Sequence, residues 1–251
     1  MSQRDAARIE ELRDQIERIS GVVTRTRTVL PFGISEIDRR LPKGGLAIGA
    51  VHEVAGGANG ALDAAAAIAF VAGIAARTGG QVLWCYSQAD LFSPALARNG
   101  LSEDRVVFFE APDDTAILGC CEEALRHGGL SAVVGEVAKL SRVSSQRLQM
   151  AAEATGTMAL IVRRWKRQVD ARDFGAPTAA YTRWRVTETQ SSPLPVRGVG
   201  RARWFLELMR CRGGECAEFE VEACDAKGFI AIPADLADGS AAAGERRRAA
   251  S

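Results

Sequence analysis

The chain has 251 residues, of which 47% are apolar and 25% charged, and its formal net charge at pH 7 is +1. This composition is that of an ordinary globular protein, long enough for one large domain with short appendages. No run approaches the roughly 18 apolar residues of a membrane span, and the charged N-terminus MSQRDAARIEELRDQ is unlike a secretory signal. We therefore expect a cytoplasmic protein that does not enter a membrane.

The chain begins with a segment typical of an amphipathic helix. Ile9, Leu12, Ile16 and Ile19 recur at steps of three and four residues with charged residues between them, and Gly21 follows. We therefore expect a separate N-terminal amphipathic helix within residues 1–21. It either docks on the main domain or reaches a neighbouring chain.

From Leu30 onward, apolar strands alternate with single helices. The expected strands cover residues 47–54, 81–87, 105–111, 130–137 and 157–164. The expected helices cover 62–78, 93–100, 113–129 and 144–156, the third opening on acidic residues and the last on a serine cap. Strands joined by single helices require a mostly parallel sheet with helices on both faces, so the fold class is α/β.

After Arg164 the helical pattern stops and three strand-like segments follow, at residues 181–189, 201–212 and 216–224. In the last segment Phe219 and Val221 alternate with glutamates, which is typical of a strand with one buried face. We expect these segments to be antiparallel strands added to the sheet edge, completing a core domain over residues 30–233. The small, polar residues 234–251 are expected to form a disordered tail.

The six cysteines form no CxxC pair, and neither histidine lies at ligand spacing from them. Structural thiols in a reducing compartment are therefore expected, with no metal site and no disulfide.

The stretch GGANG, residues 56–60, lies between a strand and a helix, as the loop of a phosphate-binding site does. Gly56, Gly57 and Gly60 supply a flexible backbone, but such a loop also needs a lysine for the phosphates and a hydroxyl for magnesium. Those positions hold Leu62 and Asp63, or Ala61 and Leu62 if the alignment shifts by one. The loop is either a structural turn or a weak nucleotide site without hydrolysis.

Basic residues crowd between Arg163 and Arg212, where twelve basic residues face four acidic ones. Trp165, Trp184 and Trp204 lie among them, and arginine with tryptophan suits phosphate contact and base stacking. Three readings stay open: a solvated face with Trp184 and Trp204 in the core, a nucleic-acid surface, or a surface for an acidic protein. The candidate binding residues are Arg163, Arg164, Lys166, Arg167, Arg172, Arg210 and Arg212.

Several stretches together resemble the ImuA family, the RecA-like proteins of bacterial SOS mutagenesis cassettes. They are LPFGISEIDRRLPKGGLAIGAVHEV, EEALRHGGLSAVVGEV, SSQRLQMAAEATGTMALIVRR, TRWRV and RWFLELMRCRGG. The likeness spans most of residues 30–225 and implies a RecA-like core.

The resemblance also implies where the groups of a RecA-type ATPase would stand. The general-base glutamate corresponds to Gln88, and the magnesium-associated aspartate to Gly135 or Glu136. The polar sensor corresponds to Arg163 and Arg164. Because a glutamine cannot take a proton from water at neutral pH, we expect no ATPase activity, no catalytic residue and no cofactor. Gly56, Gly57, Gly60 and Glu136 remain a doubtful nucleotide-binding set.

By the same resemblance, the partners are an ImuB-like relative of the Y-family polymerases and RecA, and through ImuB an error-prone polymerase and the sliding clamp. The segment from Arg163 corresponds to a mobile loop that lines the DNA in RecA, so single-stranded DNA is a further candidate. Arg210 and Arg212 correspond to a basic pair that reaches the neighbouring subunit's nucleotide. The implied function is an accessory role in error-prone translesion DNA synthesis. The alternatives are an active RecA-type ATPase and a direct regulator of RecA filaments.

Overall fold

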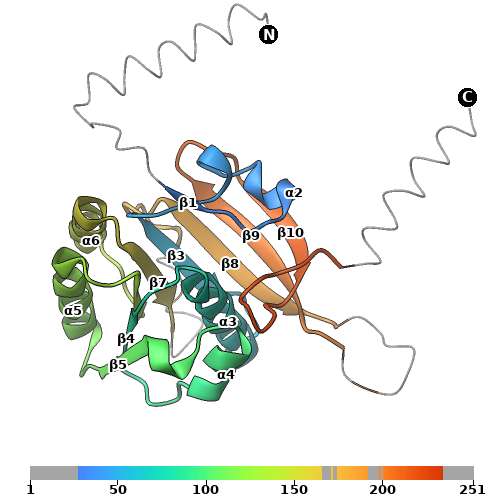
Figure 1. Cartoon of the computed structure of the whole chain (residues 1–251), viewed down its shortest axis with the longest axis horizontal. Coiled ribbons are helices and arrows are strands. Elements are labelled where there is room, and N and C mark those ends of the chain that lie inside the picture. Colours follow the sequence, from blue (N-terminus) through green and yellow to red (C-terminus); the bar gives the residue numbers. More distant parts are fainter. Residues whose placement is uncertain (1–27, 166–170, 172–173, 192–197, 199, 234–251) are drawn as a thin grey trace, which may run out of the picture.

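The computed structural model describes residues 28–165, 171, 174–191, 198 and 200–233. The expected N-terminal helix and the expected C-terminal tail lie outside these residues. Within them, the chain forms one large sheet covered by helices, with a small two-stranded ladder beside it (Figure 1).

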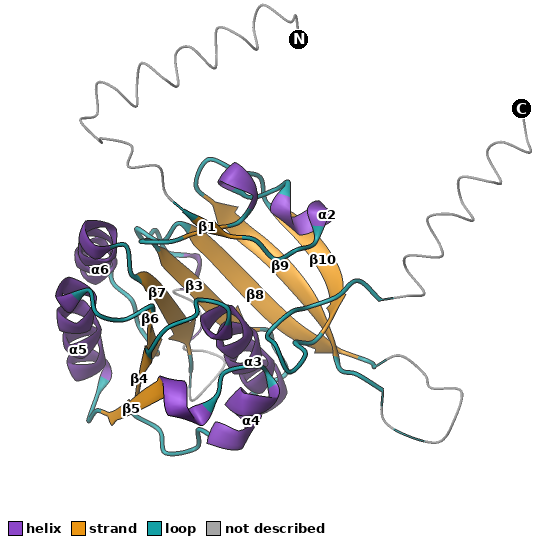
Figure 2. Cartoon of the chain, viewed as in Figure 1, coloured by secondary structure: helices purple, strands orange, loops and turns teal. Residues whose placement is uncertain are grey.

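The large sheet has eight strands in the order β10-β9-β8-β3-β7-β6-β4-β5. Its parallel part consists of β3 (Val51–Gly56), β4 (Val82–Tyr86), β5 (Val106–Glu110), β6 (Ala132–Val137) and β7 (Met158–Arg163). Its remaining strands are β8 (Thr182–Thr189), β9 (Arg203–Cys211) and β10 (Ala217–Glu222). All three C-terminal strands join one edge, as Figure 2 shows.

One of these three strands departs from the expected direction. β8 pairs in parallel with β3, and only β9 and β10 run antiparallel to their neighbours. The long segment between β7 and β8 lets the chain return to the amino edge of the sheet before β8 starts, as a parallel neighbour requires. In β10 the expected alternation is confirmed, with Phe219 and Val221 buried.

One face of the sheet is covered by α3 (Ala61–Ala76), beside which lies α4 (Ser93–Arg98). Phe70 of α3 packs with its ring centre 5.8 Å from that of Trp184 and 6.2 Å from that of Trp204. Both tryptophans are buried, so they belong to the core and cannot stack on the bases of a nucleic acid. The part of the first alternative that concerns Trp184 and Trp204 is therefore confirmed.

The opposite face of the parallel part is covered by α5 (Asp114–His127) and α6 (Arg142–Thr155). Asp113 caps α5 by accepting from the amide of Ala116, as its acidic start predicts. The cap of α6 is Ser141, which accepts from the amide of Ser144, so α6 starts two residues before the expected position. Ser141, Ser144 and Ser145 can each cap a helix, and capping preference alone does not distinguish between them.

The residues before β3 form short elements that the sequence pattern alone did not reveal. β1 (Val29–Leu30) pairs antiparallel with β2 (Leu46–Ala47), and between them lie α2 (Ser35–Asp38) and the 3₁₀ helix η1 (Pro42–Gly44). The carboxylate of Asp38 accepts from the amides of Phe32 and Gly33, at 2.8 and 3.0 Å. This turn places the Phe32 ring against Phe70 and Trp184.

Candidate functional site

The glycine loop joins the carboxyl end of β3 to the first turn of α3. Gly60 precedes α3 with φ 60° and ψ −119°, a backbone conformation that side-chain-bearing residues rarely adopt. Gly56 is needed for close approach, because a Cβ there would lie 2.6 Å from the carbonyl carbon of Asp63. The loop therefore has the tight backbone of a phosphate-binding loop, as GGANG predicts.

The carboxylate of Asp63 occupies this loop. Its Oδ2 accepts from the amide of Asn59 at 2.8 Å, and its Oδ1 accepts from the amide of Glu188, in β8, at 2.8 Å. The Asp63 residue is fully buried, and its charge lies at the N-terminus of α3, where the helix dipole favours an anion. Amide donors and a helix N-terminus are what a phosphate would use. The chain supplies its own anion instead.

Gly57 shows that the loop is closed around this side chain. Its amide donates to the carbonyl of Val186 at 2.9 Å and is therefore not free for a ligand. A Cβ at this position would lie 2.6 Å from Oδ2 of Asp63 and would also meet the hydroxyl of Thr187. Leu62, at the position of the missing lysine, is 62% exposed. The absence of a Cβ at Gly56 and Gly57 thus allows Asp63 and Thr187 of β8 to pack closely against the loop.

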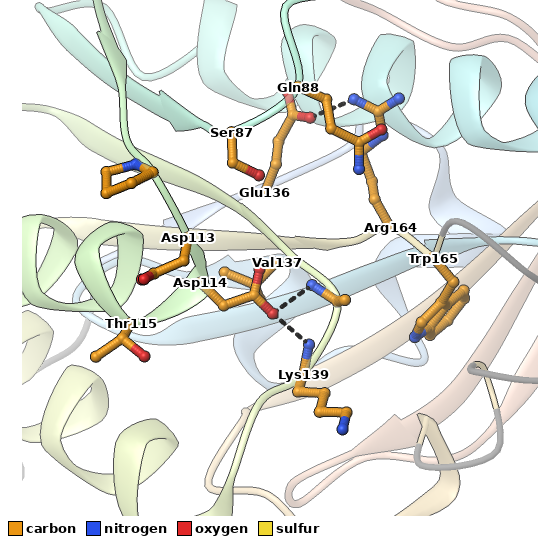
Figure 3. Close-up of a pocket in the computed structure, with 12 residues that line it drawn as sticks. Ser87, Gln88, Asp113, Asp114, Thr115, Glu136, Val137, Lys139, Arg164 and Trp165 are labelled. Atoms are coloured by element: carbon orange, nitrogen blue, oxygen red, sulfur yellow. Dashed lines mark hydrogen bonds and ion pairs between the residues drawn. The ribbon is translucent and has the colours of Figure 1, made fainter.

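Glu136, at the end of β6, is likewise occupied by protein groups. Its Oε1 accepts from the indole Nε1 of Trp84 at 2.7 Å. Its Oε2 accepts from Nη1 of Arg164 at 2.6 Å, a pair that Figure 3 shows. Arg164 also binds both carboxylate oxygens of Asp90, at 2.9 and 2.7 Å. The side chain of Glu136 is only 3% exposed. A guanidinium thus lies where a metal ion would have to bind this carboxylate.

The contacts within the Arg164 cluster shift the pKa values of Asp90 and Arg164. The hydrogen bonds from Arg164 hold the pKa of the Asp90 carboxyl below its ordinary value. In return, the hydrogen bonds to Asp90, followed by those to Glu136, raise the pKa of Arg164.

A cavity of about 550 Å³ opens beside Glu136, at the carboxyl ends of β4, β5, β6 and β7 (Figure 3). Gln88, at the position of the general base, lines it together with Lys139 and Trp165. Asp114 also lines it but accepts from the amides of Ala138 and Lys139, both at 2.9 Å. No residue of the glycine loop lines this cavity. Of the doubtful nucleotide-binding set Gly56, Gly57, Gly60 and Glu136, only Glu136 lines this cavity.

Arg163 does not lie on a binding surface, contrary to the expectation from sequence. Its side chain is completely buried, and Nη1 donates to Oε1 of Glu53 at 2.6 Å. Burial follows from the strand: Arg163 is the last residue of β7, and its side chain points to the same face as Ala159 and Ile161. Arg163 has to be removed from the candidate contact residues.

The other candidate basic residues divide into three groups. Lys166, Arg167 and Arg172 lie outside the described residues. Arg210 is half-buried and donates to the carbonyl of Thr178 at 2.6 Å. Arg212 is exposed, with its guanidinium carbon 5.4 Å from the ring centre of Tyr181.

Much of the basic excess counted from the sequence is compensated in the fold. On β8, β9 and the residues beside them, three ion pairs join Arg185 to Glu207, Arg201 to Glu222 and Arg203 to Glu220. The glutamates of β10 lie beyond the counted segment, so the count missed them. The described part of the basic segment therefore presents a mixed surface.

No protein-family profile matches the chain. The chain is similar to the curated Protein ImuA of Caulobacter vibrioides, found in two strains. The two sequences are 36% identical over 239 residues, and the match covers 90% of this chain and 97% of Protein ImuA. The chain belongs to the ImuA family. Among solved structures, the crystal structure of the RadB recombinase matches with a TM-score of 0.56 over 81% of this chain and 99% of that chain, at 14% identity. An ImuA-family chain therefore has a RecA-like fold, as its motifs predict.

This ImuA-family site holds groups that the sequence did not assign. From the sequence, Asp63 was placed only at the position of the missing hydroxyl, and its hydrogen bonds to the amides of Asn59 and Glu188 were not predicted. Glu53 and Asp90 were missed altogether, since a single acidic residue in a strand or loop carries no motif. The sequence did give an indication for Glu53, because a glutamate in an apolar strand is expected to be buried and then needs a cation beside it.

No helix in the described part of the chain is both long and apolar enough to cross a membrane.

Proposed function

We propose that this ImuA-family protein is a non-catalytic accessory factor of damage-induced, error-prone translesion DNA synthesis. The observation that carries the proposal is the Asp63 carboxylate inside the glycine loop. The amide of Asn59, which would bind a phosphate, binds Asp63, and the amide of Gly57 binds the carbonyl of Val186. A RecA-like domain whose phosphate loop is filled by its own side chain has no place for a triphosphate.

Loss of ATP hydrolysis follows from the loss of positioned charge. Phosphoryl transfer depends almost entirely on groups that stabilise the charge of the transition state. Removing one such group commonly costs about 3–4 kcal/mol of transition-state stabilisation. Here Leu62, Asp63 and Gln88 replace a lysine, a hydroxyl and a carboxylate, and Arg164 blocks Glu136. We therefore infer that no useful turnover remains.

The role left for such a domain is to hold other proteins at damaged DNA. Family membership supports an ImuB-like relative of the Y-family polymerases and RecA as direct partners. An error-prone polymerase and the sliding clamp would join through the ImuB-like protein. The scaffold would deliver or stabilise the lesion-bypass complex at a stalled primer end, with single-stranded DNA touching the basic segment that begins at Arg164.

The partnership is tested by binding assays with one partner at a time. The purified protein is mixed with the ImuB-like protein of the same organism, and separately with RecA on single-stranded DNA. The proposal predicts a complex with the ImuB-like protein whether or not ATP is present. Binding to RecA filaments without binding to the ImuB-like protein would contradict the scaffold and favour a direct filament regulator.

The DNA contact is tested by substituting three candidate basic residues that lie outside the described residues. Lys166→Ala, Arg167→Ala and Arg172→Ala together should weaken binding to a labelled single-stranded oligonucleotide and flatten its dependence on salt, because fewer counterions are released. The matched control is Arg185→Ala with Arg201→Ala and Arg203→Ala, whose side chains are ion-paired. If wild type and the Lys166, Arg167 and Arg172 variant bound the oligonucleotide with equal affinity, the proposed contact of this segment with single-stranded DNA would be contradicted.

A further inference from the structure

The large sheet ends in an open edge along β5, the last strand in its order (Figure 1). Among the described strands, β5 pairs with β4 alone. The amide of Ala111, just after β5, donates to the carbonyl of Tyr86 at 2.8 Å. Because the main-chain groups of successive residues point to alternate sides, those of Phe109 also face β4, and those of Phe108 and of the residues two before and two after it face outward. These outward groups form a row of donors and acceptors to which a further strand can pair.

Exposed apolar side chains lie on both faces of this edge. Val107 and Phe109 lie on the face whose core includes Cys85, and they are 53% and 42% exposed. Phe108 lies on the opposite face, with its ring centre 6.5 Å from that of Tyr86, and is 38% exposed. An edge strand with exposed apolar residues favours pairing with another chain, whereas most proteins protect such an edge.

The opposite edge of the sheet, β10, is protected in this way. Phe219 and Val221 of β10 are buried, and Glu218 between the turn and the core is exposed. The chain after β10 also folds back onto the edge, where the amide of Glu222 donates to the carbonyl of Ala231 at 2.8 Å. The exposure of β5 is therefore a particular property of this strand and not of the sheet as a whole.

Acidic side chains flank β5 at both ends. Glu103 and Asp104 precede it in the 3₁₀ helix η2 (Glu103–Arg105), Glu110 ends it, and Asp113 follows. All four are exposed, and none of them forms an ion pair with the described part of the chain. Arg105, which lies between them in sequence, donates inward to backbone carbonyls of the segment after α3 and of its last turn. The edge is therefore apolar in its middle and negative at both ends.

These charges disfavour a second copy of the chain on the same edge. Two β5 strands paired antiparallel around Phe108 would place Asp104 of each copy opposite Pro112 of the other, and Glu103 opposite Asp113. Carboxylates would then lie close together at both ends, and like charges directly opposite each other destabilise a strand pair. A segment with basic residues at its ends meets the same edge with opposite charges.

We propose that β5 is a docking edge, and that its occupant is an extended segment of a partner protein, apolar in its middle and basic at both ends, which adds to the sheet as a further strand. The inference rests on the proposed scaffold function, because it names the surface through which the scaffold binds a protein. Main-chain hydrogen bonds to β5 supply the affinity in such an addition. The side chains of Val107, Phe108 and Phe109 and the flanking carboxylates supply the selectivity.

The first test uses a defined peptide and the full-length protein. The probe is a short blocked peptide that alternates valine and threonine and has arginine at both ends, and the readout is amide hydrogen exchange of residues 106–110. At about twice the Kd of the peptide, exchange there should slow about threefold, because the bound edge is protected. The matched peptide with glutamate at both ends should give no protection. Equal protection by the two peptides would overturn the basic chemistry of the occupant, and protection by neither would overturn the docking edge.

Phe108→Pro tests whether the outward main chain is the binding group. The amide of Phe108 faces away from β4, so proline removes a donor from the open edge and none from the ladder within the sheet. Phe108→Val is the matched control, because it loses the same ring and keeps the amide. The arginine-ended peptide should protect Phe108→Val and not Phe108→Pro. Equal protection of the two variants would contradict strand addition.

A second variant tests the charges and does not depend on the folding of the proline variant. Glu103→Gln with Glu110→Gln should raise the Kd of the arginine-ended peptide about threefold, because two exposed charge pairs are lost. The matched control is Glu36→Gln with Glu218→Gln, two exposed glutamates away from β5. Equal Kd values for the two double variants would contradict the role of the flanking carboxylates.

The ImuB-like protein separates failure of the inference from failure of the proposed function. It should bind wild type and Phe108→Val alike, and Phe108→Pro about tenfold more weakly. Equal binding to all three would overturn β5 as the docking edge and leave the scaffold function intact. No binding even to wild type would contradict the scaffold function, and the peptide tests would still decide whether the edge accepts a basic strand. A wild-type dimer in sedimentation that Phe108→Pro abolishes would show that a second copy occupies the edge, and would overturn the proposed occupant.

Discussion

At the scale of single residues, acidic and basic side chains of the protein itself bind the polar groups at the carboxyl ends of β3 and β6. Asp63 accepts from the amide of Asn59 in the glycine loop, and Arg164 donates to the carboxylate of Glu136. That no lysine or hydroxyl follows the glycine loop at the expected positions can be read directly from the sequence. The sequence did not predict what fills the loop, since Asp63 needs the amide of Glu188, which is remote in sequence. A contact between residues so far apart in the sequence depends on the position of β8 in the sheet, and the local sequence pattern does not determine that position.

Replacing Asp63 with alanine should destabilise the protein and uncover an anion site. Two partly buried amides lose their acceptor, which should lower the free energy of unfolding by about 1–3 kcal/mol. Millimolar pyrophosphate should then raise the melting temperature of Asp63→Ala but not of wild type, because only the variant has free amides. Asp225→Ala is the control, as Asp225 also accepts from two amides, those of Lys227 and Phe229, in an exposed turn. Equal pyrophosphate effects on both variants would show that the loop is not the binding site.

The ion pair of Asp90 with Arg164 should give the stability a dependence on acid pH. Because Arg164 lowers the pKa of Asp90 in the folded state, this contribution is present above the ordinary carboxyl pKa of about 3.9 and is lost as the pH falls through the folded value. Asp90→Asn should therefore lower the melting temperature at pH 7, and the difference from wild type should shrink below about pH 4. The effect will be small, since the Asp90 side chain is 56% exposed. A constant difference down to pH 2 would contradict the assignment, and Glu123→Gln on the exposed face of α5 serves as the control.

At the scale of elements, the alternation of strands and helices predicted most of the fold. Apolar runs and glycine stops placed β3 to β7 and α3 to α6 within a few residues, because each is marked by its own local pattern. The direction of β8 was wrong, since parallel or antiparallel pairing depends on the path of the preceding segment and not on the strand itself. The short elements before β3 were also not predicted, because strands of two residues are too short to show a periodic pattern.

The contact of α3 with the sheet should dominate the stability of the core. Phe70→Ala removes a ring that packs against Phe32, Trp184 and Trp204, and should cost about 3–5 kcal/mol in urea unfolding. Phe109→Ala on β5 is the matched control, because that ring is 42% exposed and should cost far less. Similar losses of unfolding free energy in the two variants would contradict the expectation that the packing of α3 against the sheet dominates the stability of the core.

At the scale of the whole molecule, charge is the property that the sequence predicted least well. Counting within residues 163–212 gave a strong basic excess, but the fold pairs Arg163 with Glu53, Arg164 with Glu136 and Asp90, and Arg203 with Glu220. The partners come from β3, β6, β10 and the loop after β4, outside the counted segment. A linear count cannot include them, because they become neighbours only in the folded sheet. Family membership, by contrast, was predictable, since the motifs that carry it are contiguous.

The central claim is that this RecA-like domain has no nucleotide site because its own side chains occupy it. The most direct measurement is isothermal titration of the purified wild-type protein with ATP and magnesium, in the presence and absence of single-stranded DNA. The account predicts no saturable binding of ATP up to millimolar concentration in either condition. Saturable binding of about one ATP per chain at micromolar concentration, lost on substitution of Gly57 or Glu136, would contradict it.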